Sequence, residues 1–256
     1  SDPETNAILM YMEDLRHARK FMSAARAAAR SKAVVVLKAG RMPEGARAAA
    51  SHTGALAGAD DVYDAAFRRA GMLRVMTTEH LFAAVETLAR ARTLVGERLV
   101  IMTNGGGPGV MAADALAAAG GTMAVSGPET LAKLDAVLPP TWSHANPVDI
   151  IGDAPAQRYA DTLKILLEDR GNDAVLMIHV PTAIVPSAEI ARAVAPLAQA
   201  ASRNVLGCWM GADAVAEARQ VFSAAGIPAF STPEEAVNAF MQIVQYRRNQ
   251  NLLMQV

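Results

Sequence analysis

The sequence predicts an α/β fold made of two doubly wound units, each on a parallel β-sheet, with the first unit truncated at its N-terminus. Short apolar runs alternate with alanine-rich stretches of helical period, which is the pattern of strand-helix-strand crossover units. Apolar residues make up 52% of the 256 residues, charged residues 19% and aromatic residues 5%. Such a chain can bury an aliphatic core in one large or two ordinary domains.

The first unit is expected to span residues 1–94. Apolar runs and helix caps predict strands at 7–12, 33–37 and 72–75, and helices at 16–30, from Asp60 or Asp61 to about 70, and at 78–92. The stretch between the second strand and Asp60 is expected to be a loop. A doubly wound sheet of only these strands would expose its leading edge, so we expect a further strand and helix upstream.

The second unit is expected to span residues 95–256, after the break at Gly96 and Glu97. Strands are predicted at 98–102, 122–125, 174–179, 205–209 and 228–230, with an extended or turn segment at 146–150. Helices are predicted from the loop 103–109 to about 119, then at 128–138, 156–169, 187–202, 212–225 and 233–249. This unit has the elements of a complete doubly wound domain.

Composition excludes several classes of function. The net charge of −1 gives no overall attraction to nucleic acids or anionic lipids. No apolar run approaches the ~18 residues that span a bilayer, and no signal peptide opens the chain, so we expect a cytoplasmic protein and no membrane partner. The one cysteine, Cys208, lies in an apolar run typical of a core thiol. No residue cluster has the spacing of a metal site.

Candidate functional residues come directly after the predicted strands, because parallel sheets bind ligands at the carboxyl ends of their strands. Four loops qualify, and they are Glu13-Asp14, Lys38 to Arg41, Asn104 to Gly109, and Pro181 to Ala183. The basic residues of the second loop can neutralise an anion, although such residues at a strand end are more often solvated. His179 ends a strand and can line the second unit's site, whereas the remaining histidines outside the His52 segment fit the surface, and these are His17, His80 and His144.

The segment Ser51 to Gly58 places His52 among small residues and glycines, as a reachable and transiently charged imidazole requires. A turn histidine without a chemical role is the alternative. Glu13 can accept the imidazole N–H and hold one tautomer, or it can be a solvated carboxylate at a helix start. Gly105, Gly106 and Gly107 lead into a helix whose N–H groups suit a phosphate, although such glycines also permit close packing.

These segments, in this order, resemble the nucleoside-diphosphate-forming acyl-CoA synthetases, which are relatives of succinyl-CoA synthetase. The resemblance covers nearly the whole chain. Residues 38–41 and 51–58 are similar to the family's phosphohistidine segment, and residues 64–71 are similar to the stretch that comes next in that family. Residues 103–109 and 146–149 are similar to parts of its second flavodoxin-like ligase domain. Two flavodoxin-like units are therefore implied.

The resemblance implies that acyl-CoA, ADP and phosphate are interconverted with the acid, CoA and ATP through a phosphohistidine. His52 matches the phosphoryl carrier, and Glu13 the carboxylate that orients it. The family holds the phosphohistidine between two helix N-termini, one from each unit. We expect the second near Thr182 and Ala183, and the alternative cradle is the loop formed by Asn104, Gly105, Gly106 and Gly107.

The resemblance also implies partners. The family's CoA-binding domain is expected upstream, and its ATP-grasp domain elsewhere or on another chain, so the sites for CoA and for ATP or ADP with Mg²⁺ lie mostly outside this sequence. Some members are fused to an acetyltransferase of the GNAT class that modifies lysines, and residues 246–250 resemble such a junction. We also expect a homo-oligomer.

The sequence leaves three hypotheses for the function. The first is the phosphotransfer part of a synthetase acting on an acyl-CoA or carboxylic acid, with His52 as a covalent carrier. The second is a regulatory module of a protein lysine acetyltransferase. The third is a structural interaction domain whose exposed sheet edge needs a partner.

Overall fold

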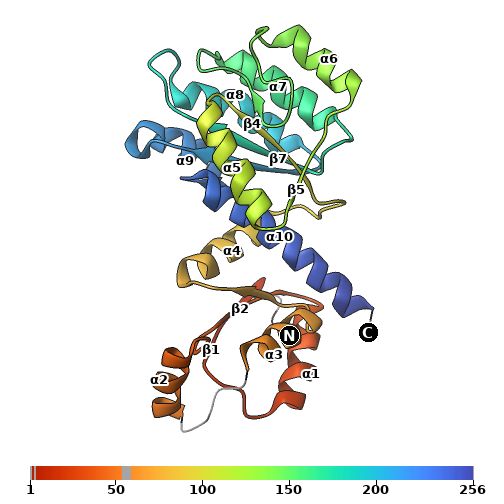
Figure 1. Ribbon diagram of the computed structural model, residues 1–256, viewed down its shortest axis with the longest axis vertical. Coiled ribbons are helices and arrows are strands. Elements are labelled where there is room, and N and C mark those ends of the chain that lie inside the picture. Colours follow the sequence, from red (N-terminus) through yellow and green to blue (C-terminus); the bar gives the residue numbers. More distant parts are fainter. Residues whose placement is uncertain (1, 3, 54–58, 256) are drawn as a thin grey trace. The chain divides into compact units, whose positions relative to one another are not determined.

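A computed structural model describes residues 2, 4–53 and 59–255, and the side chains of His52 and Thr53 lie outside that description. The chain forms two compact units, Ser1–Ala89 with Gln242–Val256, and Arg90–Met241 (Figure 1). The end of the chain thus joins the first unit, which a linear division at residue 94 does not include.

The first unit is built on a parallel sheet of order β1-β2-β3. Its elements are β1 (Ala7–Met12), α1 (Ala18–Ala29), β2 (Ala33–Lys38), α2 (Pro43–Thr53), α3 (Asp60–Arg69), β3 (Leu73–Val75) and α4 (Thr78–Arg90). The strand β2 is central, and after its first residue it is buried throughout. Apolar residues on both sides of β2 therefore need cover from helices on both faces of the sheet.

Alternate residues of β2 enter two separate cores. Val34 and Val36 pack with residues of α1 and α3, whereas Val35 and Leu37 pack with residues of α4. Figure 1 shows α4 on the other side of this sheet from α1 and α3. The last helix, α10 (Pro233–Met254), contributes Leu253 to the α1 and α3 side. The first unit is therefore doubly wound, as predicted.

One expectation in this unit is wrong, because a helix replaces most of the loop expected between β2 and α3. Residues 43–53 form α2, so the backbone of His52 lies in the last turn of a helix. Pro43 occupies the first helical position and Glu44 the first turn, both of which favour a helix start. The alanines that come after them have the highest helix propensity. Residues 54–58 of the predicted histidine loop lie outside the described residues.

The second unit contains a parallel sheet of order β5-β4-β7-β8-β9, with β6 also paired to β4. Its elements are β4 (Arg98–Thr103), α5 (Gly106–Ala118), β5 (Thr122–Met123), α6 (Pro128–Val137), β6 (Val148–Asp149), α7 (Ala156–Glu168), β7 (Ala174–His179), α8 (Ser187–Ala200), β8 (Asn204–Trp209), a 3₁₀ turn (Ala212–Val215), α9 (Ala216–Ala224), β9 (Ala229–Phe230) and the first part of α10. The α/β class and the parallel sheets predicted from the sequence are confirmed.

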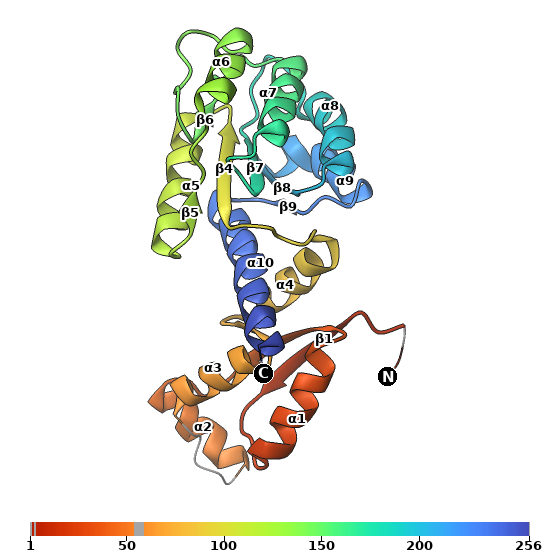
Figure 2. The ribbon, with the colours of Figure 1, turned by 90° about the vertical axis from the view of Figure 1, so that its right-hand side faces the viewer.

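Alternation along the central strands again divides the core. Val100 and Met102 of β4, and Val175 and Met177 of β7, belong to one cluster with residues of α6, α7, α8 and α9. The residues between them are also buried. Figure 2 shows α5 and α7 on opposite sides of β4. Burial on both faces explains why these strands read as continuous apolar runs in the sequence.

On the side of β4 that faces β5 and β6, one side chain pairs backbone groups between these two short strands. β5 pairs with the start of β4 and β6 with its end. Between them, Asn146 accepts a hydrogen bond from the Ile101 N–H (2.9 Å) and donates to the carbonyls of Leu99 and Ala124 (2.9 Å each). Its amide thus pairs the Ile101 N–H and the Ala124 carbonyl, and it gives a second donor to the Leu99 carbonyl, which also accepts from the Ala124 N–H (2.8 Å). This gives Asn146, which the resemblance pointed to, a clear structural role.

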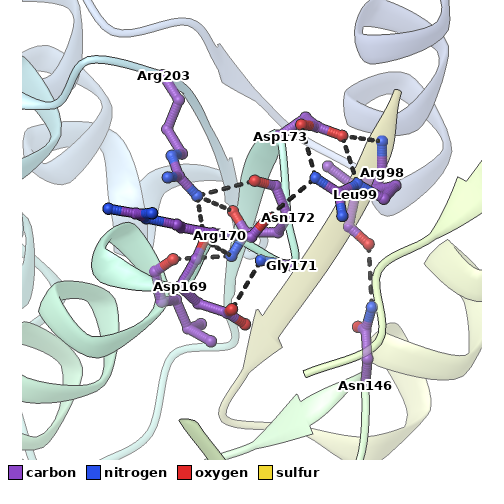
Figure 3. A network of polar contacts seen from close by, with 10 residues as sticks. Arg98, Leu99, Asn146, Asp169, Arg170, Gly171, Asn172, Asp173 and Arg203 are labelled. Atoms are coloured by element: carbon purple, nitrogen blue, oxygen red, sulfur yellow. Dashed lines mark hydrogen bonds and ion pairs between the residues drawn. The ribbon is translucent and has the colours of Figure 1, made fainter. Parts of the chain in front are cut away.

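Charged side chains connect neighbouring strands at the N-terminal end of the second sheet (Figure 3). The Asp173 carboxylate accepts from the Arg98 backbone N–H (2.9 Å) and from its Nε (2.8 Å). Arg203 donates to the Asn172 carbonyl and to its side-chain oxygen (2.8 and 2.9 Å). These contacts join the starts of β4, β7 and β8.

In the described part of the chain, no helix is both long and apolar enough to cross a membrane.

Asn146→Ala should destabilise the second unit. The change leaves partly buried backbone groups without partners, and we expect a loss of roughly 2–4 kcal/mol in the free energy of unfolding. Asn146→Asp should also destabilise, because a carboxylate cannot donate to two carbonyls. Both tryptophans, Trp142 and Trp209, lie in this unit, so tryptophan fluorescence during thermal unfolding reports on it. Gln157→Ala, on the exposed face of α7, is the control and should change little. Equal transitions in all variants would contradict this role.

Candidate functional site

The second unit has a topological switch point at β4. From β4 the chain proceeds to β5 on one side of the sheet, and later to β7, β8 and β9 on the other. At such a point the loops after the two neighbouring strands leave in opposite directions, and the crevice at their carboxyl ends binds ligands. Here those loops come after β4 and β7, and both were selected from the sequence.

Asn104 joins these two loops. Its side-chain nitrogen donates to the Val180 carbonyl (2.9 Å), and its side-chain oxygen accepts from the Val180 N–H (2.8 Å). The amide therefore extends the pairing between β4 and β7 by one step beyond the strands. Both polar atoms of this buried side chain are thus engaged within the protein. The contribution of Asn104 is to place the loop at Gly105.

The helix α5 begins directly after this bridge. Gly105 is its N-cap, and the Thr103 hydroxyl accepts the Gly105 N–H (3.0 Å) and donates to the Gly105 carbonyl (2.8 Å). The first turn of a helix leaves its N–H groups without intrahelical acceptors. Here they belong to Gly106 and Gly107, because Pro108 has no N–H. These two N–H groups lie at the positive end of the helix dipole.

The approach to this helix end is open on one side and acidic on the other. A Cβ on Gly107 would meet no other atom within 4 Å, whereas a Cβ on Gly106 would lie 3.3 Å from Asp149 Oδ2. Asp149 ends β6, and its other carboxylate oxygen accepts the Ile151 N–H (2.9 Å). An anion bound at the N-terminus of α5 would accept hydrogen bonds from the helix N–H groups and would be repelled by the Asp149 carboxylate.

Thr182 and Ala183 do not begin a helix. After β7 the chain runs through a loop, and α8 begins at Ser187 with Pro186 as its N-cap. The expectation of a helix N-terminus near Thr182 is therefore wrong. Pro186 has extended backbone (φ −60°, ψ 130°), and the helix predicted over 187–202 begins directly after it.

His179 does not line the site. Its side chain is 1% exposed, and its ring nitrogens contact the Tyr159 hydroxyl (2.8 Å) and the Ser187 hydroxyl (2.9 Å). Burial lowers the pKa of His179 to about 4, so the ring is neutral at pH 7. Burial likewise raises the pKa of Tyr159, which keeps its proton. Both ring nitrogens are therefore engaged by hydroxyl groups inside the protein, and the ring faces no open crevice.

Glu13 comes after β1 as predicted and is partly buried. Its Oε1 accepts a hydrogen bond from the Tyr11 hydroxyl (3.0 Å). The neighbouring Asp14 accepts from the Tyr63 hydroxyl of α3 (3.2 Å). The carboxylates after β1 are therefore held by tyrosines on two different elements. The His52 side chain lies outside the described residues, so its orientation by Glu13 stays a prediction.

Lys38 is buried, and the expectation that it is solvated is wrong. Its side chain is 1% exposed, whereas Arg41 is exposed. The period-two alternation that turns Val34 and Val36 toward the α1 and α3 core also turns Lys38 to that side. That alternation is the signal that would have identified Lys38. Among the residues that the structure describes, no cluster of three or more His, Cys, Asp or Glu side chains could hold a metal ion.

Nearly the whole chain matches two family models in succession. Residues 1–88 match the succinyl-CoA ligase like flavodoxin domain, and residues 99–254 match the Ligase-CoA domain. The second match alone covers more than half of the chain. The chain belongs to the succinyl-CoA synthetase-like family of acyl-CoA synthetases.

Similar members of this family are ADP-forming acetate–CoA ligases. That of Archaeoglobus fulgidus, ligase I, is 42% identical over 96% of this chain and 35% of its own length. The alpha subunit of ligase I of Pyrococcus furiosus is 35% identical over 96% of this chain and 54% of its own. This chain therefore spans about a third to a half of these relatives.

A solved structure has the same fold. The dinucleotide-forming acetyl-coenzyme A synthetase 1 of Ca. Korarchaeum cryptofilum, in complex with phosphate and ADP, matches with a TM-score of 0.91 and 34% identity. The match covers 99% of this chain and 56% of that one. The acyl-CoA synthetase resemblance predicted from the sequence is confirmed.

Acidification should destabilise the second unit through His179. Because its folded-state pKa is lowered from 6.5 to about 4, the unfolded chain binds more protons between these values. Stability is therefore present above pH 6.5 and falls as the pH drops toward 4, by at most roughly 3 kcal/mol. Unfolding followed by tryptophan fluorescence from pH 7.5 to 4.5 measures this slope.

His179→Gln should flatten that slope, because glutamine does not titrate. The control is His17→Gln, an exposed histidine of the first unit, which should leave the slope unchanged. An unchanged slope in His179→Gln would contradict the assignment.

Proposed function

We propose that this chain is the phosphoryl-transfer part of an ADP-forming acyl-CoA synthetase that acts on a small carboxylic acid such as acetate. The observation that carries the proposal is the similarity over 96% of the chain to acetate–CoA ligases named ADP-forming. The open N-terminus of α5 at a topological switch point supports it from the structure. None of these observations favours the acetyltransferase-linked alternative.

The proposed reaction has three steps. Phosphate attacks the acyl-CoA carbonyl, which forms an acyl phosphate and releases CoA. A nitrogen of the His52 imidazole attacks the phosphorus, which releases the carboxylic acid and leaves a phosphohistidine. A β-phosphate oxygen of ADP then takes the phosphoryl group, which gives ATP and free His52. A histidine suits this role because its neutral imidazole is a nucleophile at pH 7.

In this proposal Glu13 accepts the N–H of the imidazole, so that the other ring nitrogen is free to attack. The same hydrogen bond stabilises the cationic ring after phosphorylation. The partly buried position of Glu13 and its fixed contact with Tyr11 support an orienting role.

The phosphoryl group is bound, in this proposal, by the N–H groups of Gly106 and Gly107 at α5. The helix end contributes roughly 0.3–1 kcal/mol of anion stabilisation, and more where it is partly buried. Each N–H bonded to a charged oxygen adds to this. Thr182 and Ala183 belong to the neighbouring loop after β7 and stay secondary candidates.

Other domains or subunits complete the proposed reaction. A CoA-binding domain would hold CoA, and an ATP-grasp domain or subunit would hold ADP or ATP with Mg²⁺. The chain spans only 35% to 54% of its relatives, which leaves room there for both domains. A cytoplasmic location, a homo-oligomeric assembly and a fused acetyltransferase domain stay predictions from the sequence.

His52→Ala should abolish phosphorylation of the protein. The full-length protein, together with its nucleotide-binding domain or subunit, is incubated with radiolabelled ATP and Mg²⁺. We expect label that is lost in acid and retained in base, as phosphohistidine requires. His17→Ala, an exposed histidine of the same unit, is the matched control and should label normally. Absence of label in the wild type, or label that persists in His52→Ala, would overturn the proposed function.

Gly106→Pro should slow the phosphoryl transfer by about tenfold or more, because one N–H bonded to a charged acceptor contributes roughly 1.5–3 kcal/mol. Proline suits the first helical position, and Gly105 (φ −141°, ψ 121°) already has the backbone required before proline. Gly106→Ala adds the same Cβ beside Asp149 but keeps the N–H, so it is the matched control. Initial rates of His52 labelling compare them. Equal rates in the two variants would exclude this N–H as a phosphoryl ligand.

A further inference from the structure

Lys38 is a buried cation at the edge of the first sheet where the candidate carboxylates lie. It ends β2, and its register partner is Met12, the last residue of β1. Glu13 and Asp14 therefore come after β1 at the level where Lys38 ends β2. Since carboxyl ends of parallel strands share one edge, the cation and the two carboxylates belong to one cluster.

The Lys38 ammonium connects three elements of the first unit. It donates to the Ala39 carbonyl and lies 4.6 Å from the centre of the Tyr63 ring. Tyr63 belongs to α3, and its hydroxyl donates to Asp14 (3.2 Å). A continuous path of contacts thus runs from the end of β2 through α3 to the turn after β1.

The charges around Lys38 are unequally paired. The charged and titratable groups that face the ammonium are Glu13, Asp14, Asp60, Tyr63 and Arg74. Asp60 is already held by Arg74, whose Nη2 lies 2.6 and 2.7 Å from its two carboxylate oxygens. Arg74 also repels the Lys38 ammonium, and Asp14 and Glu13 are the further carboxylates that attract it.

Burying the charged Lys38 side chain costs free energy, because the ammonium loses its hydration. Burial lowers the pKa of Lys38, and the Asp60 and Asp14 carboxylates only partly oppose this. A methionine would fill a similar volume beside Val36 and Tyr63 without removing a charge from water. The position thus calls for a role that an apolar residue cannot perform.

The position of Lys38 relative to the histidine segment suggests that role. Residues 39–42 lead from Lys38 into α2, whose last turn contains the His52 backbone, and α3 begins at Asp60. Lys38 contacts the start of this segment through the Ala39 carbonyl and the element after it through Tyr63. Lys38 thus connects the end of β2, where the chain leads into α2, to α3, and through Tyr63 to Asp14 of the carboxylate turn.

We propose that Lys38 is a positioning residue for phosphoryl transfer, which fixes the Glu13-Asp14 turn relative to the two ends of the histidine segment. This inference rests on the proposed function of His52 and Glu13. Lys38 acts through Glu13 and touches neither the phosphoryl group nor the nucleotide in this role.

The test compares Lys38→Met with the wild type in the full-length protein, with its nucleotide-binding domain or subunit, Mg²⁺ and radiolabelled ATP. We expect Lys38→Met to slow His52 labelling about tenfold at pH 7. The acidic limb of its pH–rate profile should move to higher pH by about half a unit, because loss of a cation favours the protonated form of nearby carboxylates. Lys38→Arg should recover most of the rate.

A second background separates positioning from folding. In a Glu13→Gln protein, adding Lys38→Met should cause little further loss, because the carboxylate through which Lys38 acts is already absent. Tyr63→Phe keeps the ring and removes the hydroxyl that bonds Asp14 and the Leu15 backbone, so it should reproduce part of the loss with the core intact.

Three outcomes would overturn the role of Lys38 while wild-type labelling of His52 stands. They are a wild-type rate in Lys38→Met, an equal loss at every pH, or a full additional loss in the Glu13→Gln background. Tyr63→Phe with a wild-type rate and profile would also count against it. Absence of label in the wild type would instead overturn the proposed function itself, so the two failures are distinguishable.

Discussion

The constraint on which most of this structure depends is that the central strands are buried on both faces. β2, β4, β7 and β8 carry apolar side chains toward helices on each side of their sheets, so polar groups fit only near strand ends. Backbone groups at those ends still need partners. In the second sheet, the N-terminal and C-terminal ends of the strands find these partners in different ways.

At the N-terminal ends of the strands the partners are charged side chains, and they bond backbone groups of the neighbouring strands. Arg98, Asp173 and Arg203 bind one another's segments across the starts of neighbouring strands. At the C-terminal edge the partner is the neutral amide of Asn104, which pairs with Val180 and leaves the next helix end open. Backbone groups that are paired within the protein stabilise the fold, whereas N–H groups in the first turn of α5 that have no intrahelical acceptor can bind an anion. The N-terminal ends of the strands therefore contribute to stability, and the C-terminal ends leave room for a ligand.

The sequence predicted the parts of this fold that depend on periodic burial. The apolar run that became β7 was located to the residue, because a strand buried on both faces leaves an uninterrupted apolar signal. β1 was also located to the residue, although it is an edge strand and only partly buried. The pairing of Asn146 with β4 was not predictable, since it joins residues distant in sequence through one side chain. The helix α2 was missed because the glycines near His52 outweighed the alanines before it.

The candidate sites show the same limit. The loop at Gly105 was found because glycines before a helix have a local signature, and the structure gives that loop its open helix end. The start of α8 at Ser187 was predicted from the helical period of the residues after it, whereas the separate expectation of a helix N-terminus near Thr182 came from the family resemblance and is wrong. The burial of Lys38 is a consequence of strand alternation, but a charge at a strand end suggests solvent unless α3 is known to cover it.

The two units offer a phosphoryl group different kinds of chemistry. The second unit offers backbone N–H groups, which do not titrate, so a phosphoryl group bound at α5 is held by donors whose strength does not vary with pH. The first unit offers carboxylates, a histidine and a buried lysine whose pKa is lowered by burial, and these groups carry protons that can be gained or lost. Near neutral pH, the sensitivity of the proposed reaction to pH therefore arises in the first unit and in the substrates. His179, the one strongly shifted histidine among the described residues, acts on the stability of the second unit and not on this chemistry. Rate and stability can consequently be separated by pH, because different units control them.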